Sequence, residues 1–228
     1  MPPAVREVPD SDSTRDYSPT DRALLGLSRG LSFLARGPFA APGPGENYPA
    51  ARINEAPLAD VERRRAAGLM RVNHAGEVSA QALYQGQALV ARTPELRSHL
   101  RKAAAEERNH LHWCEARLRE LGEAPSVLSP LWYAGSFAIG AAAGLAGDGA
   151  SLGFVEETER QVVEHLDEHL GQLPAQDRRS RAILSAMKQD EARHGDEAAA
   201  AGAQPLPAPV RHLMKGVARI MKFGAYRI

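Results

Sequence analysis

The sequence predicts an all-α protein, and three observations support this prediction. Strand signals are nearly absent, because the chain has few runs of β-branched residues, no strict alternation of apolar and polar residues and no Asn-Gly hairpin turn. Long stretches instead carry apolar residues at the spacing of one helix face. Two of these stretches contain a Glu-x-x-His motif near their middle, which indicates that one helical unit is repeated.

Length and composition narrow the class of protein. A chain of 228 residues with 43% hydrophobic content suits one domain with a sizeable core. The 28 basic and 28 acidic residues balance, so overall charge gives no reason to expect a nucleic-acid partner. The single cysteine, Cys114, excludes an intramolecular disulfide and a cysteine-based zinc or iron–sulfur site. No glycine-rich turn follows a strand, which excludes a Rossmann domain, and the N-terminus does not resemble a secretory signal.

Three regions follow one another along the chain. Residues 1–54 are predicted to be a mostly flexible extension with one short amphipathic helix. Residues 55–206 are predicted to form a helical bundle, with helices over 57–92, 94–121, 153–171 and 174–203. Residues 207–228 are predicted to form a basic amphipathic helix.

Local signals justify the helix boundaries. Pro94 fits the first turn of a helix, because its missing N–H would have no partner there. That helix stops at Gly122, and Asp177 is the candidate N-cap of the last bundle helix.

The segment 127–155 is rich in alanine and glycine and has one charge, Asp148. Its uncharged part is nominally long enough to cross a bilayer, but Pro130 interrupts it, so a transmembrane span is the least favoured interpretation. Two others stay open: a buried helix whose small residues allow close neighbours, and a helix that touches a membrane surface or lines a channel for an apolar ligand.

The C-terminal helix has an apolar face and a basic flank. The apolar residues are Val210, Leu213, Met214, Val217, Ile220 and Met221, and the cations are Arg211, Lys215, Arg219 and Lys222. Such helices bind anionic membrane surfaces, but they also dock on helical bundles, and the segment alone favours neither.

The two Glu-x-x-His pairs are Glu107 with His110 and Glu191 with His194. Residues three apart lie on one helix face with their Cβ atoms about 5–6 Å apart, so each pair can hold one metal ion. The helix before the first pair carries a glutamate, Glu77, on its apolar stripe.

The helix before the second pair offers Glu156 in the equivalent place. Val163 and Leu170 follow it at seven and fourteen residues, so it is expected to face inward with them. Glu159, one turn later, stays open as an alternative ligand, and Glu157 is adjacent.

Four inward glutamates need compensation, because burying an unpaired carboxylate costs several kcal/mol and like charges add to that cost. Two divalent cations would neutralise the cluster, as in ferritin-like di-iron and di-manganese proteins. Carboxylate and imidazole ligands suit iron or manganese. The predicted metal ligands are Glu77, Glu107, His110, Glu156, Glu191 and His194, with Glu107 and Glu191 as the candidates to bridge both ions.

Four further residues are predicted to support these ligands. Because a ligand histidine donates its other N–H to an acceptor, we predict that Asp190 pairs with His110 and that Glu106 pairs with His194. The other two are His74 and Tyr84. His74 is expected to hydrogen-bond near the site, with a role as an extra metal ligand as the alternative. Tyr84 is expected to pack near the site, with a redox or gating role as the alternative. A second histidine pair, His165 and His169, is expected to be exposed to solvent.

Four motifs together resemble a known family. They are "LMRVNHAGEVSAQALYQGQ" (69–87), "EERNHLHWC" (106–114), "GFVEETERQVVEHLDEHL" (153–170) and "SRAILSAMKQDEARHGDEA" (180–198). They are similar to the bacterial form of demethoxyubiquinone hydroxylase, a di-iron monooxygenase of ubiquinone biosynthesis, over about residues 55–228. The resemblance implies a ferritin-like four-helix bundle with extra amphipathic helices at both ends, and its ligands fall on the six positions given above.

The resemblance also implies a function. The family hydroxylates the ring of demethoxyubiquinol with O₂, uses two Fe ions per chain and takes electrons from NADH. The implied partners are a polyprenyl quinol, an anionic membrane surface and, as candidates, other ubiquinone-biosynthesis proteins, with no nucleic acid. The implied location is peripheral, on the cytoplasmic face of the bacterial inner membrane.

Two other classes of function stay open at this point. One is a ferritin-like iron store or peroxide scavenger, which would need neither an apolar channel nor a membrane helix. The other is a non-catalytic quinone-binding protein in which the metal is only structural.

Overall fold

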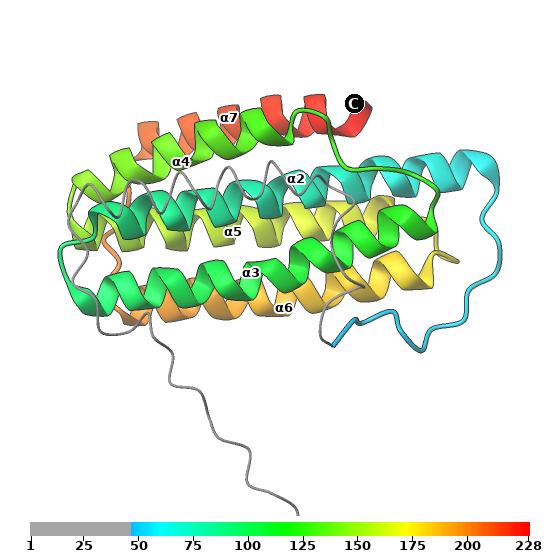
Figure 1. Ribbon diagram of the computed structural model, residues 1–228, viewed down its shortest axis with the longest axis horizontal. Helices are drawn as coiled ribbons and strands as arrows, with labels where there is room; N and C mark the ends of the chain where they lie inside the picture. The colour runs from blue at the N-terminus through cyan, green and yellow to red at the C-terminus, as the bar shows by residue number, and fades with distance from the viewer. Residues whose placement is uncertain (1–46) are drawn as a thin grey trace, which may run out of the picture.

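The computed structural model describes residues 47–228, and the short helix predicted near the N-terminus lies outside this range. The described part is all-helical, without strands, which confirms the predicted fold class (Figure 1). Its helices are α2 (Asp60–Val90), α3 (Pro94–Glu120), α4 (Ser129–Leu145), α5 (Asp148–Gln172), α6 (Arg178–Ala200) and α7 (Ala208–Arg227).

Four long helices, α2, α3, α5 and α6, form the bundle (Figure 1). The chain makes one hairpin of α2 and α3, crosses over through α4 and makes a second hairpin of α5 and α6. The two hairpins pack through α3 against α6 and α2 against α5, which is the ferritin-like arrangement. Helices α4 and α7 lie on the outer side of α2, away from α3 and α6.

Short polar side chains set the ends of the bundle helices. The Thr93 hydroxyl accepts a hydrogen bond from the Leu96 N–H at 3.4 Å and caps α3 just before Pro94. The Asp177 carboxylate accepts from the Ser180 N–H at 2.9 Å, so the predicted N-cap of α6 is confirmed.

Helix α5 begins earlier than expected. Gly147 adopts a φ of 116°, which only glycine tolerates readily, and this residue separates α4 from α5. The first residue of α5 is therefore Asp148, where the sequence had placed the start at 153. The Asp148 carboxylate accepts hydrogen bonds from the backbone N–H groups of Arg92 and Thr93, each at 3.1 Å, and so ties the start of α5 to the turn between α2 and α3.

The alanine- and glycine-rich segment forms α4, which packs on α2 through glycines. A Cβ atom at Gly140 would lie 2.2 Å from the Leu83 carbonyl oxygen, and one at Gly86 would lie 2.2 Å from the Phe137 carbonyl oxygen. The small residues therefore allow close contact, as one interpretation expected, but α4 is not a buried helix. Its outer face exposes three large apolar side chains, Leu131, Ile139 and Leu145. Among the described residues, no helix is long and apolar enough to span a membrane.

Two apolar clusters fill the bundle, one toward each end. The first includes Met70 of α2, Leu118 of α3 and Met187 of α6. The second includes Leu100 of α3 and Ala198 of α6. Between the two clusters, every one of the four helices contributes buried polar side chains, and this layer contains the candidate site.

Candidate metal centre

The polar layer brings six ionisable side chains together from all four bundle helices. They are Glu77 (α2), Glu107 and His110 (α3), Glu159 (α5), and Glu191 and His194 (α6). None is more than 4% exposed. They form two overlapping groups, and within each group one potential ligand atom per residue lies within 4.8 Å of the others.

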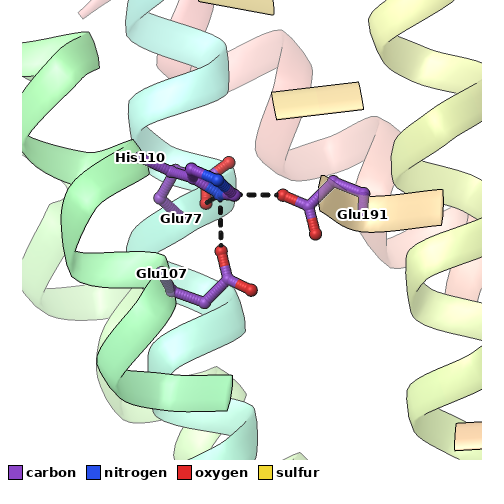
Figure 2. A group of neighbouring side chains, drawn as sticks. All are labelled: Glu77, Glu107, His110 and Glu191. Carbon is purple, nitrogen blue, oxygen red and sulfur yellow. Dashed lines mark hydrogen bonds and ion pairs between the residues drawn. The ribbon is translucent and has the colours of Figure 1, made fainter. Parts of the chain in front are cut away.

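The first group contains Glu77, Glu107, His110 and Glu191, which point toward one another in Figure 2. The Nδ1 atom of His110 lies 3.0 Å from Glu107 Oε2, 3.1 Å from Glu191 Oε1 and 3.6 Å from Glu77 Oε2. A single cation at the centre of this group could therefore contact one nitrogen and three carboxylate oxygens.

The second group contains Glu107, Glu159, Glu191 and His194. The Nδ1 atom of His194 lies 3.2 Å from Glu107 Oε1 and 3.5 Å from Glu191 Oε2. Glu107 and Glu191 belong to both groups, and each directs one carboxylate oxygen to His110 and the other to His194. This is the geometry that two bridging carboxylates require.

The position expected for Glu156 is taken by Glu159. Glu159 is 1% exposed and belongs to the second group, whereas Glu156 is only partly buried and belongs to neither. The inward stripe of α5 passes through Glu159 and Leu166, whose spacing of seven keeps them on one face. The stripe proposed from Val163 is half-buried, so the preference for Glu156 was wrong by one turn.

The two outer acids make the predicted contacts. His110 Nε2 lies 3.1 Å from Asp190 Oδ2, and His194 Nε2 lies 2.7 Å from Glu106 Oε2. Each contact joins α3 to α6, because each acid supports the histidine of the opposite helix. These carboxylates fix the ring orientation that directs both Nδ1 atoms into the site.

Burial and neighbouring charges shift the pKa values of the buried glutamates in different directions. Burial raises the pKa of Glu77 and of Glu159 well above its usual range, and the neighbouring carboxylate of Glu191 raises both further. Burial acts in the same direction on Glu107, but the neighbouring imidazoles of His110 and His194 outweigh it and lower the pKa to about 2.

The histidines respond in the opposite sense. Burial alone would lower the pKa of each imidazole, but hydrogen bonds to surrounding carboxylates raise the pKa of His110 well above its usual range. The same balance raises the pKa of His194 to about 11. Without metal, the six side chains therefore hold protons in place of cations, because a buried cluster of four carboxylates needs compensating positive charge.

The donor set fits divalent iron or manganese. Several buried atoms at the centre of the layer have no hydrogen-bond partner: Glu77 Oε2, Glu107 Oε1, Glu159 Oε1 and His194 Nδ1. A buried polar atom without a partner is energetically unfavourable, so these four atoms indicate that a ligand binds between them. Carboxylate oxygens and imidazole nitrogens without thiolates favour iron or manganese over softer metals.

The remaining predicted residues lie outside the six. His74 Nε2 is 3.4 Å from Glu115 Oε1, a buried partner that no sequence pattern indicates. Tyr84 packs in the second apolar cluster, and its buried hydroxyl has no hydrogen-bond partner. His169 is only 6% exposed, so the expectation that it faces solvent was wrong; the C-terminal helix α7 covers this part of α5, with Lys222 Nζ 3.4 Å from Nδ1 of the adjacent His165.

A four-helix bundle that buries four glutamates and two histidines in two groups sharing two carboxylates defines a class: the ferritin-like helical bundles, with a buried carboxylate and histidine cluster that could hold metal.

The comparisons give the family. Residues 64–224 match the family model described as "Ubiquinone biosynthesis protein COQ7", and the chain belongs to this family. The chain is 55% identical over 216 residues to the "3-demethoxyubiquinol 3-hydroxylase" of Bordetella avium, covering 95% of this chain and 98% of that one. Proteins with the same name from Cupriavidus taiwanensis (64% identity, 73% of this chain and 81% of that one) and Xanthomonas campestris pv. campestris (54% identity, 98% and 100%) are also similar. The predicted family is confirmed.

Proposed function

We propose that this chain is a di-iron monooxygenase that hydroxylates the ring of demethoxyubiquinol with O₂ during ubiquinone biosynthesis. The relatives named above are hydroxylases of this quinol and cover nearly the whole chain. The observation that carries the proposal is the pair of overlapping ligand groups, because two shared carboxylates suit two ions held side by side.

Two irons would be held by the six side chains of the polar layer, with Glu107 and Glu191 bridging. Bound iron would supply the redox chemistry that activates O₂. The protein residues do the rest: Asp190 and Glu106 orient the two imidazoles, and the apolar clusters on both sides of the layer exclude water from it. We further propose NADH as the source of electrons.

A polyprenyl quinol resides in a lipid bilayer, so the enzyme has to reach a membrane surface. Helix α7 offers an outward apolar stripe with Leu213, Ile220 and Phe223 exposed by 68%, 68% and 65%. Its other side docks on the bundle, where Met221 packs against Val72 and Ala75 of α2. The docking interpretation of the basic helix therefore holds for its inner face, and its outer face is the one that we propose contacts the membrane.

The basic flank of α7 divides in the same way. Lys215 lies 3.3 Å from Glu164 and Lys222 lies 3.7 Å from Glu168, so these two cations face α5. Arg211 and Arg219 are exposed and can attract an anionic leaflet. We propose that α7, together with the exposed face of α4, contacts the cytoplasmic face of the bacterial inner membrane. Other ubiquinone-biosynthesis proteins are the candidate partners there.

The test is single-turnover hydroxylation by anaerobically reduced protein of known metal content. We expect about two irons per chain and conversion of a short-chain demethoxyubiquinol to its hydroxylated product after O₂ is admitted. The variant Glu159→Gln should bind iron more weakly and lose activity, whereas Glu156→Gln, three residues away on the same helix, should match wild type in both.

Three outcomes would contradict the proposal. One zinc per chain would exclude a di-iron site. Oxidation of many irons per chain without product would indicate an iron store. An intact fold that binds the quinol but leaves it unchanged with two irons and O₂ would indicate a binding protein.

A further inference from the structure

Outside the six candidate ligands, Arg193 on α6 connects the two acids that support the histidines. Its Nη2 atom donates to Asp190 Oδ1 at 3.2 Å and lies 3.5 Å from Glu106 Oε2. Its Nη1 atom donates to Glu197 Oε1 at 2.9 Å. One guanidinium therefore spans the carboxylates behind both imidazoles.

Two chains of contacts meet at this arginine. In the first chain, Asp190 Oδ2 contacts His110 Nε2, and Asp190 Oδ1 accepts a hydrogen bond from Arg193. In the second chain, Glu106 Oε2 lies 2.7 Å from His194 Nε2, and Glu106 Oε1 lies 3.6 Å from Lys102 Nζ.

We propose that Arg193 is a positioning residue that holds Asp190 and Glu106 against the two histidines, and that its positive charge makes the metal pair easier to reduce. This inference rests on the proposed di-iron site.

The acids need such a support because both are partly exposed, at 36% for Asp190 and 32% for Glu106. Glu106 also borders a surface depression that it lines together with His99, Lys102 and His194. A carboxylate at that edge can rotate toward water and leave its histidine unsupported. A planar guanidinium with several donors can hold two carboxylates at once, which a lysine cannot do with the same geometry.

The positive charge of Arg193 also affects how easily the metal pair is reduced. Two Fe(II) ions and four ligand glutamates balance, whereas the three acids Asp190, Glu106 and Glu197 lie beside only two cations, Arg193 and Lys102. Removing Arg193 increases the surplus negative charge and makes Asp190 and Glu106 stronger acceptors for the imidazole N–H groups. The imidazoles then donate more electron density to the metal, which favours Fe(III) over Fe(II).

The test compares Arg193→Gln, Arg193→Lys and wild type in the iron-loaded full chain. A mediated redox titration followed by EPR of the mixed-valent state gives the one-electron midpoint. For Arg193→Gln we expect an equilibrium about tenfold less favourable to reduction, a midpoint lower by about 59 mV. Lys188→Gln is the matched control, because it removes one cation from α6 that pairs with Asp167 and should leave the midpoint unchanged.

The results for the two arginine variants either support or overturn the inference. Arg193→Lys keeps the charge but not the bridge, so a midpoint close to that of wild type together with a broadened EPR signal supports a positioning role. A wild-type line shape in Arg193→Lys would overturn positioning and leave only the charge effect, and a wild-type midpoint and line shape in Arg193→Gln would overturn both. Exposed ion pairs contribute little to folding, so the metal-free melting temperatures should agree. A wild-type chain that binds no iron would instead defeat the proposed function, and this inference with it.

Discussion

Metal binding should displace protons from the site, and the structure gives their number. In the metal-free chain, raised pKa values keep Glu77 and Glu159 protonated and keep His110 and His194 as imidazolium ions. Glutamate and histidine bind metals only after losing these protons. Loading two divalent ions should therefore release about four protons per chain, or two per ion.

The pH dependence of the affinity follows from this count. A release of two protons per ion makes the binding constant rise about 100-fold for each unit of pH, which is about 2.7 kcal/mol per ion. The sign is positive because the metal-free state holds more protons than the loaded state. The slope persists while the pH stays below the raised pKa values, and it falls toward one proton per ion as Glu77 and Glu159 ionise.

Isothermal titration calorimetry measures this release directly. Anaerobic Fe(II) or Co(II) is titrated into the metal-free chain near pH 6.5 in buffers of different ionisation enthalpy, and the slope of the observed enthalpy gives the protons released. Glu159→Gln should release about three, since an amide has no proton to lose, whereas Glu156→Gln should still release about four.

A release of one proton or fewer for two bound ions would refute the reasoning. It would mean that the metal-free site is already deprotonated and that the buried negative charge is balanced in some other way. Equal release by wild type and Glu159→Gln, with Glu156→Gln lowered, would instead restore Glu156 as the ligand.

Three further predictions concern stability and surface. Asp177→Ala should lower the free energy of unfolding in urea by about 3–5 kcal/mol, because it removes the α6 cap and leaves a buried arginine without its closest carboxylate. Gly140→Ala should cost about 1–3 kcal/mol in the same assay by forcing α4 away from α2, whereas Gly135→Ala, which meets nothing within 4 Å, should not destabilise the fold. Reversing the charge of both Arg211 and Arg219 should weaken cosedimentation with anionic vesicles by about 1 kcal/mol per cation or more, most strongly at low salt, and undiminished binding would place the membrane contact on α4.

The fold and most of the site could be predicted because the chain repeats one helical unit. Each Glu-x-x-His pair fixes the inward face of its helix by itself, since three residues nearly complete a turn. The near-symmetry of the two halves then placed Asp190 opposite His110 and Glu106 opposite His194, and the structure has both contacts.

On α5, a glutamate without a paired histidine predicts the inward face of the helix less well than a Glu-x-x-His pair does. Glu156 and Glu159 differ by about 60° around the helix axis, and apolar residues follow both at intervals of seven. Val163 and Leu170 pack at the edge of the bundle, whereas Leu166 and Leu173 are buried. The sequence does not distinguish an edge from a centre, because leucine and valine occupy both.

The helices outside the bundle were harder to predict for a related reason. Small residues in α4 indicated close packing but not how much of the helix it would cover, and only one face meets α2. In α7, the apolar residues that sequence periodicity assigned to one face divide between the bundle and solvent, because Met221 turns inward and Ile220 outward.

Helix α2 lies between the polar layer, which contains the candidate metal ligands, and the proposed membrane surface. Its inner face carries Glu77, and its outer face receives α4 at Gly86 and α7 at Gly68, where a Cβ would lie 2.7 Å from the Tyr226 ring. A helix with its side chains is about 10 Å across. If α4 and α7 contact the bilayer as proposed, the ring of a lipid-embedded quinol has to travel little more than this thickness to reach the irons. The glycines that bring α4 and α7 close to α2 would then also shorten the path of the substrate.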